Sequence, residues 1–142
     1  MELDQNGLDF IAAQEGIVLH PYKDTKGIPT IAIGNTFYPD GTKVTMSDPT
    51  INIKRAYEIF SAVSKDFQKA VSDTNPNLNQ NQFNALFSLC YNIGIHAYQN
   101  STVHRLVSAN PNDPDIGEAF EMWRNPPELL KRRKREVDLY FS

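Results

Sequence analysis

The fold is decided by residues 15–36, which read EGIVLHPYKDTKGIPTIAIGNT. Upstream of this stretch, apolar residues recur with the spacing of an amphipathic helix, at Leu8, Ile11 and Ala12. Glu15 continues the series, so its carboxylate falls on the apolar face, where removing a charge from water is costly without a partner. We therefore expect a helix that ends near Glu15 and holds an acid on its inner side.

The second half of the stretch has the pattern of a β-hairpin. Asp24 and Gly27 occupy the first and last positions that these residue types prefer in a type I turn. Residues 29–33 then alternate as in a strand, with the isoleucines on one face and the smaller residues on the other: Ile31 and Ile33 against Thr30 and Ala32. An inward acid at a helix end thus faces a hairpin that carries a second acid and a hydroxyl group.

The rest of the chain predicts one more turn and a series of helices. A turn at residues 39–41 closes a small antiparallel sheet over residues 20–46. Apolar steps of three and four residues predict one helix of about 20 residues, roughly 30 Å long, that starts near Ile53. Shorter helices are expected after their capping residues, in this order: 79–94, 101–107, 115–123 and 128–141.

These elements predict an α+β fold in a single domain of residues 1–142. A small N-terminal lobe of residues 1–50 carries the hairpins, residues 51–74 form a connecting helix, and residues 75–142 form an all-helical lobe. We expect a substrate groove between the two lobes.

Composition argues against several classes of function. The 17 acidic and 14 basic residues leave a formal charge of −3, which is unlike a general nucleic-acid-binding protein. The single cysteine, Cys90, excludes an internal disulfide framework and falls on an apolar helix stripe, so we expect a buried, inert thiol. The histidines His20, His96 and His104 have no metal-ligand spacing with it, and no cofactor motif occurs, so neither a metal nor a cofactor is expected.

No targeting or membrane segment is visible in the sequence. The N-terminal residues MELDQNG lack the basic and apolar regions of a signal peptide, and no apolar run approaches the ~20 residues of a membrane span. We expect a monomer that is made in the cytoplasm and does not insert stably into a membrane. A target outside the cytoplasm would require a separate pore or delivery machine for export.

The spacing Glu15-x8-Asp24-x5-Thr30, with Glu-Gly at its start and Thr-Ile-x-x-Gly after it, resembles the phage-type lysozyme (endolysin) family. Further motifs are similar to the same family, in particular to lysozymes of tailed phages of enteric bacteria. They are LNQNQFNALFSLCYNIG (78–94), NSTVHRL (100–106), Trp123 and RRKRE (132–136). The resemblance therefore covers nearly the whole chain and implies a lysozyme-like fold.

The resemblance implies a muramidase that cuts the β-1,4 bond between N-acetylmuramic acid and N-acetylglucosamine in peptidoglycan glycan strands. Such hydrolysis needs two carboxyl groups beside the scissile bond. By resemblance, Glu15 is the general acid, Asp24 the carboxylate opposite it, and Thr30 the hydroxyl that positions water. Tyr91 and Asn92 match the block that faces the cleft from the helical lobe, and Thr36 is a weaker candidate for the cleft wall.

Other interpretations of these residues stay open at this point. Glu15 can form a local salt bridge, Asp24 can serve only to form the turn, and Thr30 can be an ordinary β-branched strand residue. The chain as a whole can also be a lysozyme-like binding or structural module with weak or no catalysis, or a secreted antibacterial effector with the same activity. An intact triad favours the lytic enzyme.

Two features of the sequence are unusual: a departure from the family motif, and an arginine on the apolar face of a helix. The family usually reads Thr-Ile-Gly-x-Gly-His where this chain has Ala32 and Asn35, and we expect altered stability or cleft shape rather than lost chemistry. In the last helix, Arg133 falls on the apolar side, where an arginine needs an acceptor. A pair with Glu136 on the same helix does not explain an inward position, so we hypothesise that Arg132 or Arg133 reaches Glu15.

Overall fold

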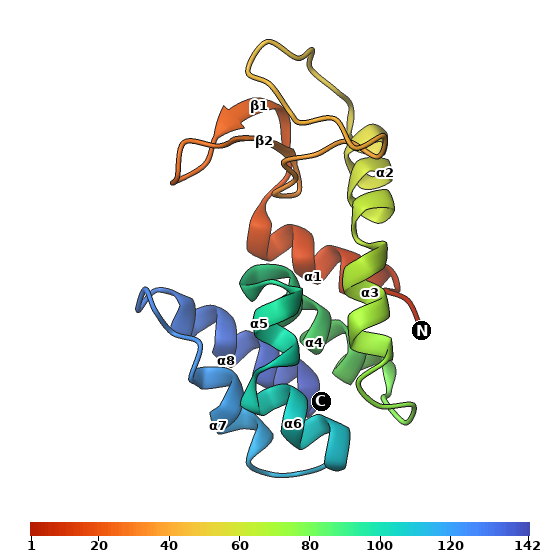
Figure 1. Cartoon of the computed structure of the whole chain (residues 1–142), viewed down its shortest axis with the longest axis vertical. Coiled ribbons are helices and arrows are strands. Elements are labelled where there is room, and N and C mark those ends of the chain that lie inside the picture. Colours follow the sequence, from red (N-terminus) through yellow and green to blue (C-terminus); the bar gives the residue numbers. More distant parts are fainter. The chain divides into compact units, whose positions relative to one another are not determined.

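A computed structural model describes residues 1–142 and contains helices together with one two-stranded antiparallel sheet (Figure 1). The elements follow in the order α1 (Gln5–Glu15), β1 (Val18–Lys23), β2 (Pro29–Ala32), α2 (Ile53–Val63), α3 (Lys65–Ser72), α4 (Gln80–Ile93), α5 (Ile95–Gln99), α6 (Thr102–Ala109), α7 (Ile116–Glu121) and α8 (Leu129–Tyr140). None of the helices is long and apolar enough to cross a bilayer. The α+β fold class predicted from the sequence is confirmed.

The chain forms two compact units. The hairpin unit consists of Ile11–Asp66, and the helical unit consists of Met1–Phe10 with Phe67–Ser142. Helices α1 and α3 each contribute residues to both units. All three residues of the predicted triad belong to the hairpin unit.

The hairpin unit is built on the turn that the sequence predicted. The backbone N–H of Gly27 donates to the carbonyl of Asp24 over 2.9 Å, the hydrogen bond that commonly closes a type I turn. The antiparallel strands pair Tyr22 with Thr30 and Val18 with Ala32, with an irregularity between Val18 and Tyr22. Helix α2 packs on this hairpin, and the shared core is made of apolar side chains: Ile31, Ala32, Val44, Ala56 and Ile59.

The predicted alternation over residues 29–33 was wrong. Strand β2 ends at Ala32, and Ile31, Ala32 and Ile33 are all fully buried. The reason is the backbone of Ala32, whose φ of 62° lies in the left-handed region. The chain reverses there, and Ile31 and Asn35 exchange two backbone hydrogen bonds of 2.9 Å across the turn. The sheet itself has two strands, and the second predicted turn adds an isolated bridge between Phe37 and Lys43.

The single helix expected from Ile53 is interrupted at Ser64. Asn52 caps this helix, because its side chain accepts a hydrogen bond from the backbone N–H of Arg55 over 2.8 Å. At the break, the Ser64 hydroxyl donates to the carbonyl of Ser61, a local bond that competes with regular helix geometry. The apolar spacing continues through this residue, so the sequence pattern does not reveal the interruption.

The helical unit is organised around α4, against which α5 and α8 pack (Figure 1). All residues from Gln82 to Cys90 are buried, so this helix is surrounded rather than amphipathic. A capping box starts the helix, because the side chains of Asn79 and Gln82 each accept a hydrogen bond from the other residue's backbone N–H. Cys90 is fully buried, as expected, and burial raises its thiol pKa to about 12. Helix α5 was not predicted.

Candidate active site

Glu15 is the last residue of α1, and its side chain is half-buried. The helix ends there because Gly16 takes a φ of 79°, a left-handed conformation that costs glycine little. The N–H of Gly16 donates to the carbonyl of Ala12 over 2.8 Å and completes the last turn. A glycine directly after the acid therefore fixes where the carboxylate leaves the helix.

Asp24 stands at the tip of the hairpin, half-buried, and is held by the turn that it forms. Its Oδ1 accepts two backbone hydrogen bonds, from Lys26 over 2.8 Å and from Ile28 over 2.9 Å. Both bonds use the same oxygen, so Oδ2 takes neither of them. The turn thereby orients the carboxylate and leaves its second oxygen for another partner.

Thr30 lies in β2 and is almost completely buried. Its hydroxyl donates to the carbonyl of Ile28 over 2.8 Å. Because a hydroxyl has one proton and two lone pairs, this bond uses the proton and leaves the oxygen as an acceptor. Thr30 is therefore oriented to receive a hydrogen bond rather than to give one.

Tyr22 joins these residues, although sequence reasoning did not select it. It pairs with Thr30 across the hairpin, and its phenol is half-buried. Its pKa is raised by burial first and then by the negative charges of Glu15 and Asp24. Both carboxylates therefore lie close enough to influence one phenol. The available signal was its position two residues before Asp24, because residues i and i+2 of a strand share a face.

Thr36 is also in the hairpin unit and is half-buried. Its carbonyl accepts a hydrogen bond from the backbone N–H of Val44 over 2.9 Å, within the second turn region. The neighbouring Asn35 is buried, and its side-chain oxygen accepts from the N–H of Ile33 over 3.2 Å. The buried Asn35 side chain thus stabilises the turn at Ala32 through this hydrogen bond.

The remaining candidates, Tyr91 and Asn92, lie at the end of α4 in the helical unit. The ring of Tyr91 stacks on Phe87 with centroids 5.7 Å apart and meets the edge of Phe67 at 5.2 Å. Asn92 accepts a 2.7 Å hydrogen bond at Oδ1 from Nη2 of Arg133. Asn92 and Trp123 also help line a surface hollow of about 480 Å³.

The arginines of the last helix have an acceptor on that helix. Glu136 is fully buried, with its Oε1 2.8 Å from Nε of Arg133 and its Oε2 3.3 Å from Nε of Arg132. The Ser88 hydroxyl of α4 donates a short hydrogen bond to the same carboxylate. Burial raises the pKa of Glu136, and the two guanidinium groups oppose that shift. The expectation that a same-helix pair cannot explain an inward arginine was therefore wrong.

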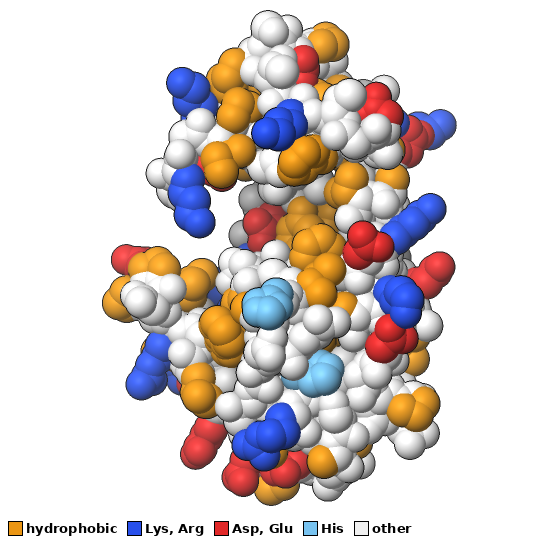
Figure 2. All heavy atoms as spheres, viewed as in Figure 1, with side chains coloured by type: hydrophobic (Ala, Val, Ile, Leu, Met, Phe, Trp, Pro, Cys, Tyr) orange, Lys and Arg blue, Asp and Glu red, His pale blue; other side chains and the backbone are white.

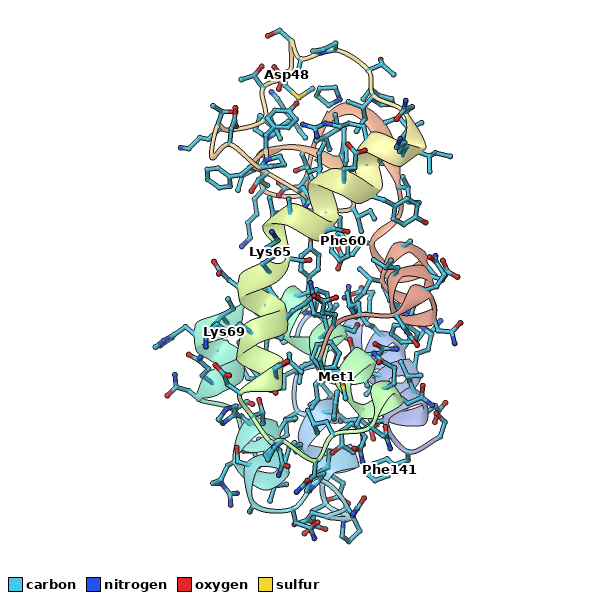
Figure 3. All side chains as sticks on the ribbon, turned by 90° about the vertical axis from the view of Figure 1, so that its right-hand side faces the viewer. Met1, Asp48, Phe60, Lys65, Lys69 and Phe141 are labelled. Atoms are coloured by element: carbon cyan, nitrogen blue, oxygen red, sulfur yellow. The ribbon has the colours of Figure 1, made fainter.

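Surface charge is mixed on the face shown in Figure 2. Acidic and basic side chains are interspersed over the helical unit, and histidine side chains show over α5 and α6. The exposed ion pairs include Lys69 with Asp73 at 2.7 Å and Lys134 with Glu121 at 3.0 Å. Lys69 follows Lys65 along α3 (Figure 3). Pairs of this exposed kind add little to stability.

Comparison with known proteins identifies similar chains. A family model described as phage lysozyme matches residues 12–136. The endolysin of Salmonella phage P22 is 37% identical over 147 positions, which cover 100% of this chain and 99% of that protein. An endolysin structure from Escherichia coli O157:H7 phage FAHEc1 has a TM-score of 0.90 at 36% identity, covering 99% of this chain and 93% of that chain. The muramidase domain of SpmX from Asticaccaulis excentricus has a TM-score of 0.83 at 25% identity, covering 99% and 98%.

Proposed function

The chain belongs to the phage lysozyme family, and on that premise we propose that it is an endolysin, a glycoside hydrolase that degrades peptidoglycan during phage lysis. The bond that it cuts is the β-1,4 bond between N-acetylmuramic acid and N-acetylglucosamine. It acts on the cell wall as a monomer, after export through a separate pore or delivery machine.

The observation that carries this proposal is the arrangement of the hairpin unit. Glu15 at a helix end and Asp24 at a turn both influence the phenol of Tyr22, and Tyr22 pairs with Thr30. Two carboxyl groups are what hydrolysis of a glycosidic bond requires, and a hydroxyl oriented as an acceptor can hold the attacking water. Hydrogen bonds to the local backbone fix the Asp24 carboxylate and the Thr30 hydroxyl, and the end of helix α1 places Glu15.

In the proposed reaction, Glu15 gives its proton to the glycosidic oxygen as the bond between that oxygen and the anomeric carbon breaks. A water molecule forms the new bond to the anomeric carbon and gives one proton to Asp24. Its second hydrogen is held by Thr30 Oγ1, whose own proton is used on the Ile28 carbonyl. With both hydrogens directed to protein oxygens, a lone pair of the water remains for the sugar.

The helical unit supplies the proposed sugar contacts. Because Arg133 occupies Oδ1 of Asn92, the amide presents its N–H groups, which suit the carbonyl oxygen of an acetamido group. Tyr91 offers an aromatic face beside it, and Trp123 lines the same hollow as Asn92. Thr36 is kept as a weaker contact of the hairpin unit.

A clearing assay on Gram-negative cells with permeabilised outer membranes tests the proposal, with wild type beside Glu15→Gln. The glutamine keeps the size of the side chain but cannot deliver a proton, so activity should fall by about 10² to 10⁴-fold. Glu58→Gln, an exposed change in the same unit, is the matched control and should keep full activity.

Mass spectrometry of the released material identifies the bond. Fragments with muramic acid at the reducing end are expected. Release of cut peptide cross-links alone would remove the muramidase assignment. Binding of the wall without release of fragments would instead support the binding-module alternative.

A further inference from the structure

Tyr22 shares one face of the hairpin with two members of the proposed triad. It lies directly opposite Thr30 in the antiparallel pair, and side chains of paired residues point to the same side of a sheet. Asp24 follows two positions later, and its N–H still bonds to the Ile28 carbonyl over 3.0 Å, so the ladder continues to that residue. The phenol, the carboxylate and the threonine hydroxyl therefore line one surface.

The hydroxyl of Tyr22 makes no hydrogen bond within the protein, although its side chain is half-buried. Tyrosines with restricted exposure usually bond through their hydroxyl groups, and others in this chain do so. Tyr38 bonds to Asp48 over 2.7 Å, Tyr98 to Thr74 over 2.7 Å, and Tyr140 to the Pro111 carbonyl over 2.6 Å. Tyr22 differs from these three, and its hydroxyl belongs to the surface that carries Asp24 and Thr30.

The chemical state of this phenol follows from its surroundings. Burial and the charges of Glu15 and Asp24 raise its pKa above the ordinary value of 10.0, so the phenol stays protonated at the pH of any cell. It is a neutral hydrogen-bond donor and cannot act as a base there. A donor without a protein partner, beside two carboxylates, suits an oxygen atom of a ligand.

We propose that Tyr22 is a further substrate-contacting residue, whose hydroxyl donates a hydrogen bond to a sugar oxygen of the glycan at the bond that is cut. This inference rests on the proposed function. It adds to the triad a residue that holds the sugar in place without taking part in proton transfer. Loss of one such bond weakens both binding and turnover, because the sugar is then less well oriented.

Tyr22→Phe removes only the hydroxyl and is compared with Tyr38→Phe, a change of the same kind in the same unit. Tyr22→Phe should lower kcat/KM on soluble glycan fragments by about tenfold, with an unchanged melting temperature because no protein hydrogen bond is lost. Tyr38→Phe should lower the melting temperature and keep kcat/KM, because its hydroxyl bonds to Asp48. Wild-type kcat/KM in Tyr22→Phe, or a loss that tracks its melting temperature, would overturn the proposal.

A binding measurement separates this inference from the proposed function. In the Glu15→Gln background, the added Tyr22→Phe change should raise the Kd for soluble glycan fragments by about tenfold in calorimetry. An unchanged Kd overturns the role of Tyr22 even if the enzyme hydrolyses the wall. No release of glycan fragments by the wild type overturns the proposed hydrolysis, and equal release by wild type and Glu15→Gln overturns the role of Glu15. In either case a raised Kd in the double variant still supports the contact of Tyr22.

Discussion

Arg133 of α8 holds Asn92 of α4 through a 2.7 Å hydrogen bond from Nη2 to Oδ1. The guanidinium is itself fixed by Glu136, and both charged side chains are fully buried. The amide of Asn92 therefore has one orientation, set by a charge pair beneath it. A candidate sugar contact thus depends on an ion pair that has no direct role in the chemistry.

This dependence predicts the effect of removing either arginine. Arg133→Ala should lower the free energy of unfolding by about 3–5 kcal/mol, because it leaves a buried carboxylate with one fewer positive partner. Arg132→Ala should cost less, because Arg132 lies 3.3 Å from Glu136 and is slightly exposed. Urea denaturation of both variants measures the two values. Unfolding free energies within error of wild type for both would contradict the buried cluster and, with it, any contact of either arginine with Glu15.

Two substitutions of Asp24 should separate its structural and chemical roles. Asparagine keeps the Oδ1 that accepts from the N–H groups of Lys26 and Ile28, but it cannot take a proton from water. Asp24→Asn should melt like wild type and lose about 10² to 10⁴-fold in activity. Asp24→Ala should lose activity and also stability, because the two N–H groups lose their acceptor. Full activity in Asp24→Asn would exclude Asp24 as the base.

Ala32 is predicted to tolerate glycine, because two effects oppose each other. Glycine removes the strain of a left-handed alanine, which stabilises the fold by roughly 1–2 kcal/mol. It also removes a buried methyl group, which destabilises the fold by about 0.8 kcal/mol. The unfolding free energy of Ala32→Gly should therefore stay within about 1 kcal/mol of wild type. Gly27→Ala is the control, since φ there is 78° and a Cβ meets nothing within 4 Å, so any loss reflects the backbone alone. A Gly27→Ala variant as stable as wild type would show that left-handed strain is negligible in this hairpin.

The hydrogen bond between Tyr38 and Asp48 should stabilise the hairpin unit only over a middle range of pH. Asp48 lies in the loop that precedes α2 (Figure 3), and its pKa is lowered from 3.8 by hydrogen bonds from Thr45 and Tyr38. That contribution is present above pH 3.8 and is lost as the pH falls below it. Burial and the bond to Asp48 raise the pKa of Tyr38 from 10.0 to about 12, so its contribution is lost as the pH rises through that interval.

The difference in melting temperature between wild type and Tyr38→Phe measures this bond. It should be largest near neutral pH and should shrink in strong acid and in strong base. A difference that stays constant across this range would show that the phenol supports the loop by packing alone.

Local chemistry explains what could be predicted from the sequence. The caps at Asn52 and Asn79 and the turn at Asp24 each depend on residues within four positions, so short patterns specify them. The candidate triad could also be identified from the sequence, because its three residues lie within one hairpin and the end of the preceding helix. Their catalytic roles stay a prediction.

The features that the sequence did not reveal depend on backbone geometry or on partners distant in the chain. The inward and outward alternation of side chains over β2 breaks down because the backbone of Ala32 is left-handed. An alanine in the sequence does not predict that conformation. Burial of Glu136 depends on Ser88, 48 residues away, and on two arginines that arrive together. The sequence pattern does not distinguish Tyr22 from an ordinary strand residue, because its partner Thr30 is set by the pairing of the hairpin.

The buried Cys90 gives the chain a built-in reporter of local opening. Its thiol is fully buried in α4, and a pKa near 12 leaves almost no thiolate to react. A thiol reagent can therefore modify it only in molecules whose α4 has opened. Since this is the single cysteine of the chain, the labelling rate measures the opening equilibrium of the helical unit alone. The thermodynamics of that unit can thus be followed in the unaltered protein while the hairpin unit stays unlabelled.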